Sequence, residues 1–190
     1  MEEAKKIDNP ADQVLIDNYL AGSDADFNVL YERYKRQLYA YLHRMLPGQH
    51  AVIDDIFQQV WIKVIAKLPV YQHSNKFQAW LMRIAHNMTI DFFRRSKKNA
   101  TVSVDNDDTL IQLPDCREMP WTELCMTELS TAVAAALEQL PVEQKEVFLL
   151  RQDKISFKEI AEIQQCSINT ALGRMQYAIK NLRKELDSLF

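Results

Sequence analysis

Glycine is scarce in this chain, with three in 190 residues. Phosphate-cradling loops and dinucleotide-binding turns need several glycines at fixed spacing, so the scarcity argues against both kinds of nucleotide site. The three cysteines are an odd number without paired spacing, which favours a reduced, cytoplasmic protein. No run reaches the ~18 consecutive apolar residues of a membrane span, and the first residues lack the apolar core of a signal peptide.

Metal-ligand spacing is also missing. Asp54 and Asp55 are adjacent, and neighbouring side chains on a helix do not converge on one ion. No histidine pair is joined by carboxylates at helical metal spacing, which makes a helical metal-dependent hydrolase the weakest functional hypothesis. The histidines in question are His43, His50, His73 and His86. We therefore expect no catalytic residues, no metal, no cofactor and no small-molecule substrate.

Apolar residues make up 47% of the chain, and long stretches of helix-forming residues dominate it. These features predict an all-α protein with two small helical domains, 1–98 and 121–190, joined by a flexible acidic linker, 99–120. The net charge is only −3, but it is unevenly distributed. Residues 76–98 hold six basic and one acidic residue, whereas residues 99–128 hold one basic and seven acidic residues. The basic block is the part suited to a polyanion.

A helix-turn-helix is predicted between residues 153 and 184. Ser156 and Glu159 have the spacing of a capping box, and Ser167 is a favourable cap for a second helix. Apolar residues of that second helix recur at helical spacing, and its opposite face is polar and cationic, as in a helix that reads a DNA major groove. The alternative is an ordinary helical hairpin. The polar face holds Asn169, Thr170, Arg174, Gln176, Tyr177 and Lys180.

Helices are also predicted at 11–21, 25–46, 51–68, 77–98 and 121–140, with another beginning at Pro141. On the 77–98 helix, Arg83, Asn87 and Arg94 share one outer stripe beside several aromatic residues. Single-stranded DNA is bound by such a combination, because cations follow the phosphates and aromatic rings stack on bases. The competing interpretation is that the aromatics are core residues and that Arg94 pairs locally with Asp91.

Taken in order, four stretches of this chain resemble a bacterial RNA polymerase sigma factor of the extracytoplasmic-function subgroup. Residues 54–61 (DDIFQQVW) are similar to the family's polymerase-binding helix, and residues 77–95 to its minus-ten promoter helix. Residues 140–151 (LPVEQKEVFLLR) resemble the entry to its second domain, and the predicted helix-turn-helix resembles its minus-thirty-five reader.

The resemblance implies a transcription initiation factor whose partners are bacterial core RNA polymerase, promoter DNA and an anti-sigma factor. By this resemblance, polymerase would be bound by Asp54, Asp55, Gln58, Gln59 and Trp61. Minus-ten DNA would be bound by Asn75, Lys76, Phe77, Trp80, Arg83, Asn87, Arg94 and Arg95. Minus-thirty-five DNA would be bound by Asn169, Thr170, Arg174, Tyr177 and Lys180. The acidic linker would run toward the RNA exit channel.

The sequence departs from the family pattern in the helix-turn-helix. Gln165 stands where the turn usually has glycine, and we expect it to adopt a left-handed conformation at modest cost. Leu172 and Gly173 stand where the family often has lysine and serine, so the promoter sequence does not follow from the resemblance. The alternative function is an autonomous helix-turn-helix regulator, but such a protein does not need the basic and aromatic run at 76–98.

Overall fold

The computed structural model describes residues 10–72, 76–100 and 128–187, and all regular secondary structure within those ranges is helical. The predicted all-α class is therefore confirmed. The first helices are α1 (Asp12–Leu20), α2 (Asp24–Met45), α3 (His50–Lys67), the short 3-10 helix η1 (Leu68–Val70) and α4 (Phe77–Ala100). The remaining helices are α5 (Glu128–Glu138), α6 (Val142–Gln152), α7 (Phe157–Ile163) and α8 (Ile168–Asp187).

Two glycines set the boundaries of the first helices. Gly22 follows α1 with φ of +107° and Gly48 follows α2 with φ of +75°, a region that side chains with a Cβ rarely adopt. Both positions agree with the helix ends expected from the sequence. Asp12 at the start of α1 accepts hydrogen bonds from Arg33 and Tyr34, which fixes α1 against α2.

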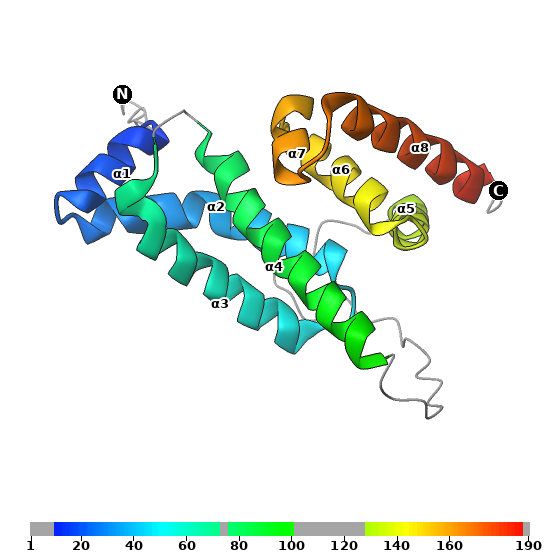
Figure 1. The fold of residues 1–190 in the computed structure, drawn as a ribbon, viewed down its shortest axis with the longest axis horizontal. Helices are drawn as coiled ribbons and strands as arrows, with labels where there is room; N and C mark the ends of the chain where they lie inside the picture. The colour runs from blue at the N-terminus through cyan, green and yellow to red at the C-terminus, as the bar shows by residue number, and fades with distance from the viewer. Residues whose placement is uncertain (1–9, 73–75, 101–127, 188–190) are drawn as a thin grey trace, which may run out of the picture.

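The helices form two groups, and Figure 1 shows α1–α4 on one side and α5–α8 on the other. In the first group, α3 and α4 lie side by side and α2 crosses behind them. Apolar side chains at helical spacing fill the space between the three helices. Among the fully buried ones are Leu30, Leu38, Leu42, Ile53, Leu81 and Met82.

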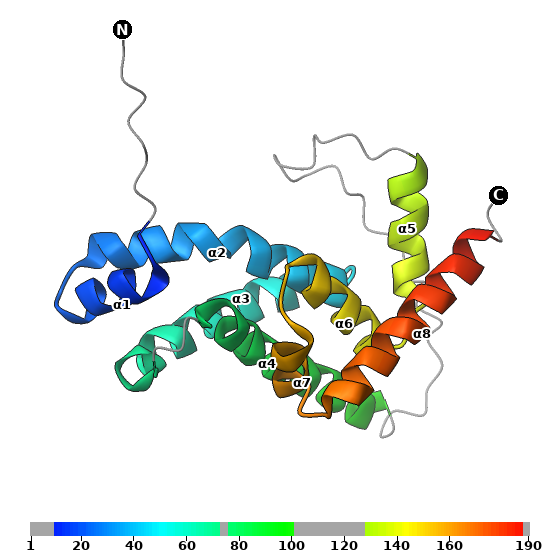
Figure 2. The ribbon, with the colours of Figure 1, turned by 90° about the horizontal axis from the view of Figure 1, so that it is seen from above.

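In the second group, α7 and α8 form the predicted helix-turn-helix, α6 packs against both of them, and α5 packs near the carboxyl-terminal half of α8. Seen from above, α5 projects away from the rest of the molecule (Figure 2). A small separate core lies between α5 and α8. It consists of Ala136, Leu137, Leu140, Ala178 and Leu182.

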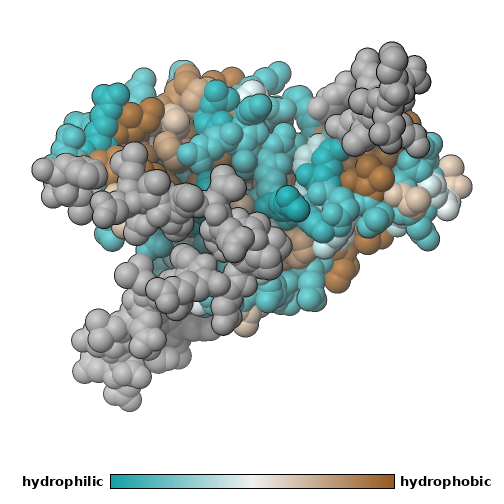
Figure 3. All heavy atoms as spheres, turned by 180° about the vertical axis from the view of Figure 1, so that it is seen from behind, coloured by the Kyte–Doolittle hydropathy of each residue, from teal (hydrophilic) through white to brown (hydrophobic). Residues whose placement is uncertain are grey.

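The two groups contact each other through α7 against α4 and α6 against α2. One continuous set of buried side chains joins them, running from Leu15 in α1 to Ala171 in α8. The chain is therefore closed, with its two helical groups sharing a core. The surface seen from behind is mostly hydrophilic, with separate hydrophobic areas (Figure 3).

Several expectations lie outside the described residues. They are a loose polar arm expected over residues 1–10 (all but Pro10), His73 and Asn75 of the loop expected before the 77–98 helix, most of the acidic linker, and the start of the 121–140 helix.

Candidate nucleic-acid and protein interfaces

The exposed face of α3 carries the acidic and amide residues expected to bind polymerase. Asp54, Asp55, Gln58 and Gln59 are all exposed. Asp54 accepts a 2.9 Å hydrogen bond from Tyr39, and Asp55 accepts a 2.7 Å bond from Gln59. Burial, and then the bond to Asp54, raises the pKa of Tyr39 to about 12, so the phenol stays protonated and keeps donating at neutral pH. Two exposed carboxylates in the second turn of α3, each accepting a hydrogen bond, suit a cationic partner surface.

Trp61 lies on the opposite, inner side of α3. Its side chain is 6% exposed, and its ring lies 4.8 Å from that of Tyr31, centroid to centroid, and 6.0 Å from that of Phe27. The structure therefore places Trp61 in the core, where it fixes α3 against α2, instead of on the surface with the four residues above. The resemblance of residues 54–61 to the family's polymerase-binding helix does not reveal that Trp61 is buried, because residues of this stretch lie on both faces of the helix.

A basic and polar stripe runs along the outside of α4. Arg83, Asn87, Arg94 and Arg95 are exposed, as their helical spacing predicts. Arg94 forms a 2.9 Å ion pair with Asp91, which is the local pairing considered from the sequence. Exposed pairs of this kind contribute little free energy, so Arg94 can exchange Asp91 for a phosphate at small cost.

The aromatic residues at the start of α4 differ in exposure. Phe77 is 1% exposed and belongs to the core, in agreement with the structural interpretation of that residue. Trp80 is half-buried, with its ring centroid 4.7 Å from that of Tyr71 and 5.6 Å from that of Phe77. Lys76 is half-buried too, and its ammonium lies 4.0 Å from the carboxylate of Glu162 on α7. Trp80 is thus the ring of this set that offers a partial face to a base.

The contact with the second helical group lies on a different side of α4. Gln78 donates a 2.9 Å hydrogen bond to the backbone oxygen of Asp153, and His86 Nδ1 lies 2.7 Å from Glu146. Residues one position apart on a helix are separated by about 100° around its axis. Asn87 therefore remains exposed although His86 is covered, and the outer stripe of α4 is accessible in the closed chain.

The turn of the helix-turn-helix has the geometry that its sequence predicts. Ser156 and Glu159 form a complete capping box at the start of α7. Ser167 accepts a 3.0 Å bond from the backbone of Thr170 at the start of α8. Gln165, between the two helices, has φ of +52°, which confirms that a non-glycine residue occupies the left-handed position here.

The polar face of α8 holds most of the predicted DNA-reading residues together. Asn169, Thr170, Tyr177 and Lys180 are exposed on it. Arg174 is different, because it is half-buried and its Nη1 donates a 2.7 Å bond to Oε1 of Gln164, at the end of α7. The side chain is therefore directed to the flank of the helix and is held there.

The apolar residues of α8 do not all face inward. Ala171, Ala178 and Leu182 are buried, whereas Leu172 and Ile179 are each 37% exposed. The small alanines let α8 approach its neighbours closely, so the larger side chains are displaced to the flank. The sequence pattern missed this, because alanine carries a weak signal of burial.

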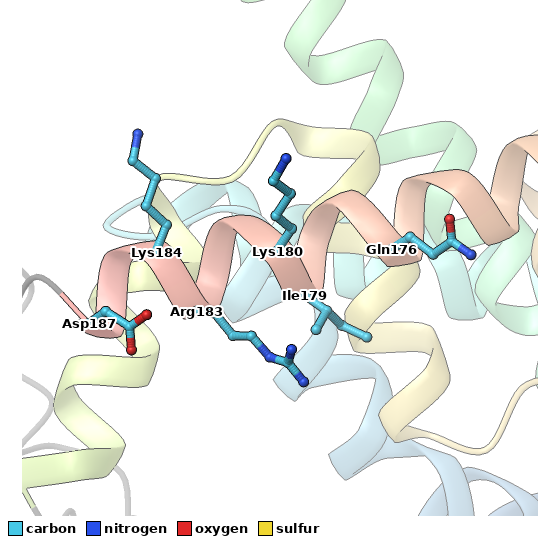
Figure 4. A pocket seen from close by; sticks show the side chains of 6 residues that line it. All are labelled: Gln176, Ile179, Lys180, Arg183, Lys184 and Asp187. Atoms are coloured by element: carbon cyan, nitrogen blue, oxygen red, sulfur yellow. The ribbon is translucent and has the colours of Figure 1, made fainter.

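An open groove on the carboxyl-terminal half of α8 adds two cations, Arg183 and Lys184, to the residues predicted from the sequence. In Figure 4, Lys180 and Lys184 extend to one side of the helix, and Ile179 and Arg183 extend to the other. Lys184 follows Lys180 by four positions on one side of the groove, and Arg183 follows Ile179 by four positions on the other. That spacing is the signal that could have identified them.

The part of the chain that the structure describes contains no group of three or more histidine, cysteine, aspartate or glutamate residues able to hold a metal ion. Among the same residues, no helix is long and apolar enough to cross a membrane. What the geometry offers is three exposed polar surfaces, on α3, α4 and α8.

Two family models match the chain in the same order as these surfaces. Sigma-70 region 2 matches residues 30–99, and Sigma-70 region 4 matches residues 130–182. The chain is 28% identical over 174 residues to the ECF RNA polymerase sigma factor SigW of Bacillus subtilis, covering 88% of this chain and 92% of that protein. It is 28% identical over 171 residues to the ECF RNA polymerase sigma-E factor of Escherichia coli K12, covering 86% and 88%.

Solved structures share the fold. The sigma factor RpoE of Bartonella quintana, in complex with the anti-sigma factor NepR, superposes with a TM-score of 0.69 at 22% identity, covering 85% of this chain and 97% of that chain. CnrH, in complex with the cytosolic domain of CnrY, superposes with a TM-score of 0.66 at 22% identity, covering 94% and 99%.

Proposed function

Because this chain belongs to the extracytoplasmic-function group of bacterial sigma factors, we propose that it binds core RNA polymerase in the cytoplasm and directs the enzyme to one class of promoter. The polymerase carries out RNA synthesis, whereas this chain binds the promoter DNA, melts it and positions the polymerase on it. The observation that carries the proposal is the ordered set of exposed surfaces on α3, α4 and α8, of which the first two lie in the match to Sigma-70 region 2 and the third lies mostly in the match to region 4.

Each part of the chain has a separate role in this proposal. Residues 1–98 bind polymerase and melt the minus-ten element, residues 99–120 link the domains, and residues 121–190 read minus-thirty-five DNA. The matched regions, 30–99 and 130–182, fit this division.

Polymerase docks on the exposed face of α3. Asp54 and Asp55 supply two carboxylates, Gln58 and Gln59 supply amides, and Ile62 lies 64% exposed one turn further along. An apolar residue next to fixed polar groups is typical of a protein interface with a hydrophobic centre and a polar rim. Trp61 supports this surface from beneath through its ring contacts with Tyr31 and Phe27.

Melted minus-ten DNA is captured along α4. Arg83, Arg94 and Arg95 hold phosphates, while Asn87 offers one donor and one acceptor to the edge of an unstacked base. Trp80 stacks on a base with its accessible face, and Phe77 supports the Trp80 ring from the core. Such contacts favour the melted state because a base inside the duplex cannot reach them.

Duplex minus-thirty-five DNA is read by α8. Asn169 and Thr170 lie in its first turn, the part of a recognition helix that contacts base edges. Lys180 and Tyr177 reach the adjacent backbone, and Arg183 and Lys184 extend the positive surface. An anti-sigma factor is the expected third partner, by analogy with the sigma factor RpoE of Bartonella quintana, whose structure is a complex with the anti-sigma factor NepR.

Co-elution with purified bacterial core RNA polymerase on a sizing column tests this function. The wild-type chain is expected to form a stable complex, and Asp54→Ala with Asp55→Ala to weaken it. The matched control is Asp17→Ala with Asp24→Ala, which removes the same charge from exposed positions on α1 and α2. Absence of a complex, together with tight and selective binding of the free chain to duplex DNA, would contradict the proposal and favour an autonomous regulator.

A further inference from the structure

A buried carboxylate lies at the centre of the contact between the two helical groups. Glu146 on α6 is 1% exposed. Its Oε1 accepts a 2.5 Å hydrogen bond from the Tyr41 hydroxyl on α2 and lies 2.7 Å from Nδ1 of His86 on α4. A buried carboxylate is costly unless it is hydrogen-bonded, so these two partners from the first group are part of what makes the closed arrangement favourable.

The second oxygen of Glu146 continues the chain of hydrogen bonds into the helix-turn-helix. Oε2 accepts a 2.7 Å bond from Nε2 of Gln164, which also donates to the backbone oxygen of Glu143. The Oε1 atom of the same Gln164 amide accepts the 2.7 Å bond from Arg174. An amide with both ends engaged has its orientation fixed, so Gln164 transmits the position of Glu146 to the guanidinium of Arg174.

The other polar contacts between the groups are less buried than those of Glu146. Gln78 donates a 2.9 Å bond to the backbone oxygen of Asp153 in a part-buried position. Arg44 donates a 2.9 Å bond to Gln152 in an exposed position, and Lys76 is 4.0 Å from Glu162. Exposed contacts of this type are weak, because water competes for both partners. The buried set around Glu146 is where loss of one hydrogen-bond donor has the larger effect.

We propose that Glu146 is an interdomain latch: in the closed chain, Tyr41 and His86 hold it, and through Gln164 it keeps Arg174 turned away from the DNA-reading face of α8. Parting of the two groups removes both donors from Glu146 and frees Gln164 and Arg174 to reorient. Glu146 and Gln164 are positioning residues in this scheme, and Arg174 is the residue that contacts DNA. The inference rests on the proposed function of α8 as a reader of duplex DNA.

The latch leaves two surfaces accessible. The exposed faces of α3 and α4 are not covered by the second group, whereas Arg174 is engaged. A partner can therefore dock on α3 while the chain is closed, and reading by Arg174 follows opening. The contact between the groups therefore sets an order, in which docking on α3 precedes the reading of duplex DNA by Arg174.

The first arm of the test measures the shape of the free chain and involves neither DNA nor polymerase. Tyr41→Phe and His86→Phe each remove one donor to Glu146 while keeping a ring of similar size. Small-angle X-ray scattering of the double variant is expected to show a larger radius of gyration than that of the wild type. The control is Tyr34→Phe, which removes a hydroxyl bonded to Asp12 inside the first group and should leave the radius unchanged. Circular dichroism of each variant verifies that its helices are retained.

The second arm measures affinity for a duplex enriched from a random pool by the chain bound to core polymerase. The free double variant should bind this duplex about tenfold or more tightly than the free wild type. In the wild type, the contacts of Glu146 with Tyr41 and His86 must first break before Arg174 can bind DNA, and the double variant lacks them. Adding Arg174→Ala to the double variant should abolish this gain, while adding Arg174→Ala to the wild type should change the affinity of the free chain much less.

An unchanged radius of gyration in the double variant would overturn the latch. An increased radius with no gain in duplex affinity, or a gain that persists with Arg174→Ala, would overturn the role of Arg174 in it. Failure of the proposed function would look different: no duplex would be enriched from the pool, while the scattering arm would still decide whether the contacts of Glu146 hold the groups together.

Discussion

His86 and Asn87 are neighbours on α4 but face different surroundings: the His86 ring contacts the buried Glu146 of the second helical group, while Asn87 is exposed to solvent. The closed contact between the groups and the predicted DNA stripe thus occupy two sides of one helix. A substitution on the stripe can therefore be made without disturbing the contact, which makes the function of α4 testable residue by residue.

Replacing Asn87 by alanine tests base capture. We expect Asn87→Ala to bind core polymerase normally but to form open complexes less readily, by about 1–3 kcal/mol, because a desolvated base loses its hydrogen-bond partner. Permanganate reactivity of unpaired thymines near the minus-ten element reports this opening. Asn28→Ala, an exposed asparagine on α2, is the control. Open-complex formation at the wild-type level would remove Asn87 from the base pocket.

Replacing Arg174 by alanine tests base reading. In the chain bound to polymerase, Arg174→Ala should cost about 1–3 kcal/mol of binding at one base pair of the selected duplex and relax the preference there. Lys180→Ala should instead weaken binding to all sequences alike. It should also reduce the slope of log K against log salt concentration by about one, as expected when one phosphate contact is lost. The check is a set of single-base-pair variants of the duplex, titrated at two salt concentrations. Equal loss on every variant would mean that Arg174 does not read a base edge.

Gly173 lies in the interior of α8, and a Cβ added to it would meet no atom within 4 Å. Gly173→Ala should therefore raise the free energy of unfolding by up to about 1 kcal/mol, since alanine favours the helix over glycine. Packing gives no reason for glycine here, and the position is four residues from both Asn169 and Tyr177 on the polar face. We accordingly expect the same substitution to weaken duplex binding by reducing close approach of the DNA.

Thermal unfolding and duplex titration of the same sample separate the two effects of Gly173→Ala. Ala40→Gly, at an exposed position of α2, is the reverse control: it should lower stability and leave duplex binding unchanged. A stabilised Gly173→Ala variant with unchanged affinity would show that the glycine serves no close contact.

His43, near the end of α2, predicts a pH dependence of stability. Its Nε2 atom is buried without a hydrogen-bond partner, and burial, followed by nearby His50, lowers the pKa of His43 below 6.5, although Asp54 opposes the shift. The folded chain thus binds fewer protons than the unfolded chain between the lowered pKa and 6.5. The free energy of unfolding should therefore fall as the pH drops through this window.

Denaturant unfolding at about pH 7.5 and about pH 5.5 measures this loss, and His43→Gln should reduce it. His50→Gln should raise the pKa of His43 toward its ordinary value, because the second cause of the shift is removed. Nuclear magnetic resonance titration of the His43 ring follows that change directly. A His43 pKa at or above 6.5 in the wild type would contradict the prediction.

The helix-turn-helix could be predicted from the sequence because its signals are local. Ser156 and Glu159 are three residues apart, Ser167 caps the helix that follows it, and Gln165 lies in the short turn between them. Interactions within four residues fix these features, and the sequence shows all the partners at once. For the same reason the exposed stripe of Arg83, Asn87 and Arg94 follows from helical spacing alone.

The closed contact could not be predicted in this way. Tyr41 and Glu146 are 105 positions apart, and no periodicity within either helix indicates that they meet. The resemblance assigns Trp61 to polymerase binding, but local spacing does not decide whether its side chain faces the core or the solvent. Arg174 has the spacing of the polar face of α8, yet its partner Gln164 draws it to the flank. In each case a tertiary neighbour outweighs the local pattern.

The continuous core between the helical groups also determines how the chain opens on slow timescales. Val147 and Leu150 of α6 belong to the same buried cluster as Leu42 and Leu81 of the first group, whereas the apolar residues of α5 belong to the small cluster with α8. Local opening of α5 therefore exposes little apolar surface, while opening of α6 disrupts the shared core. Backbone amides of α5 consequently exchange their hydrogens with solvent before those of α6. Amide exchange therefore reports on the two buried clusters of the second group separately.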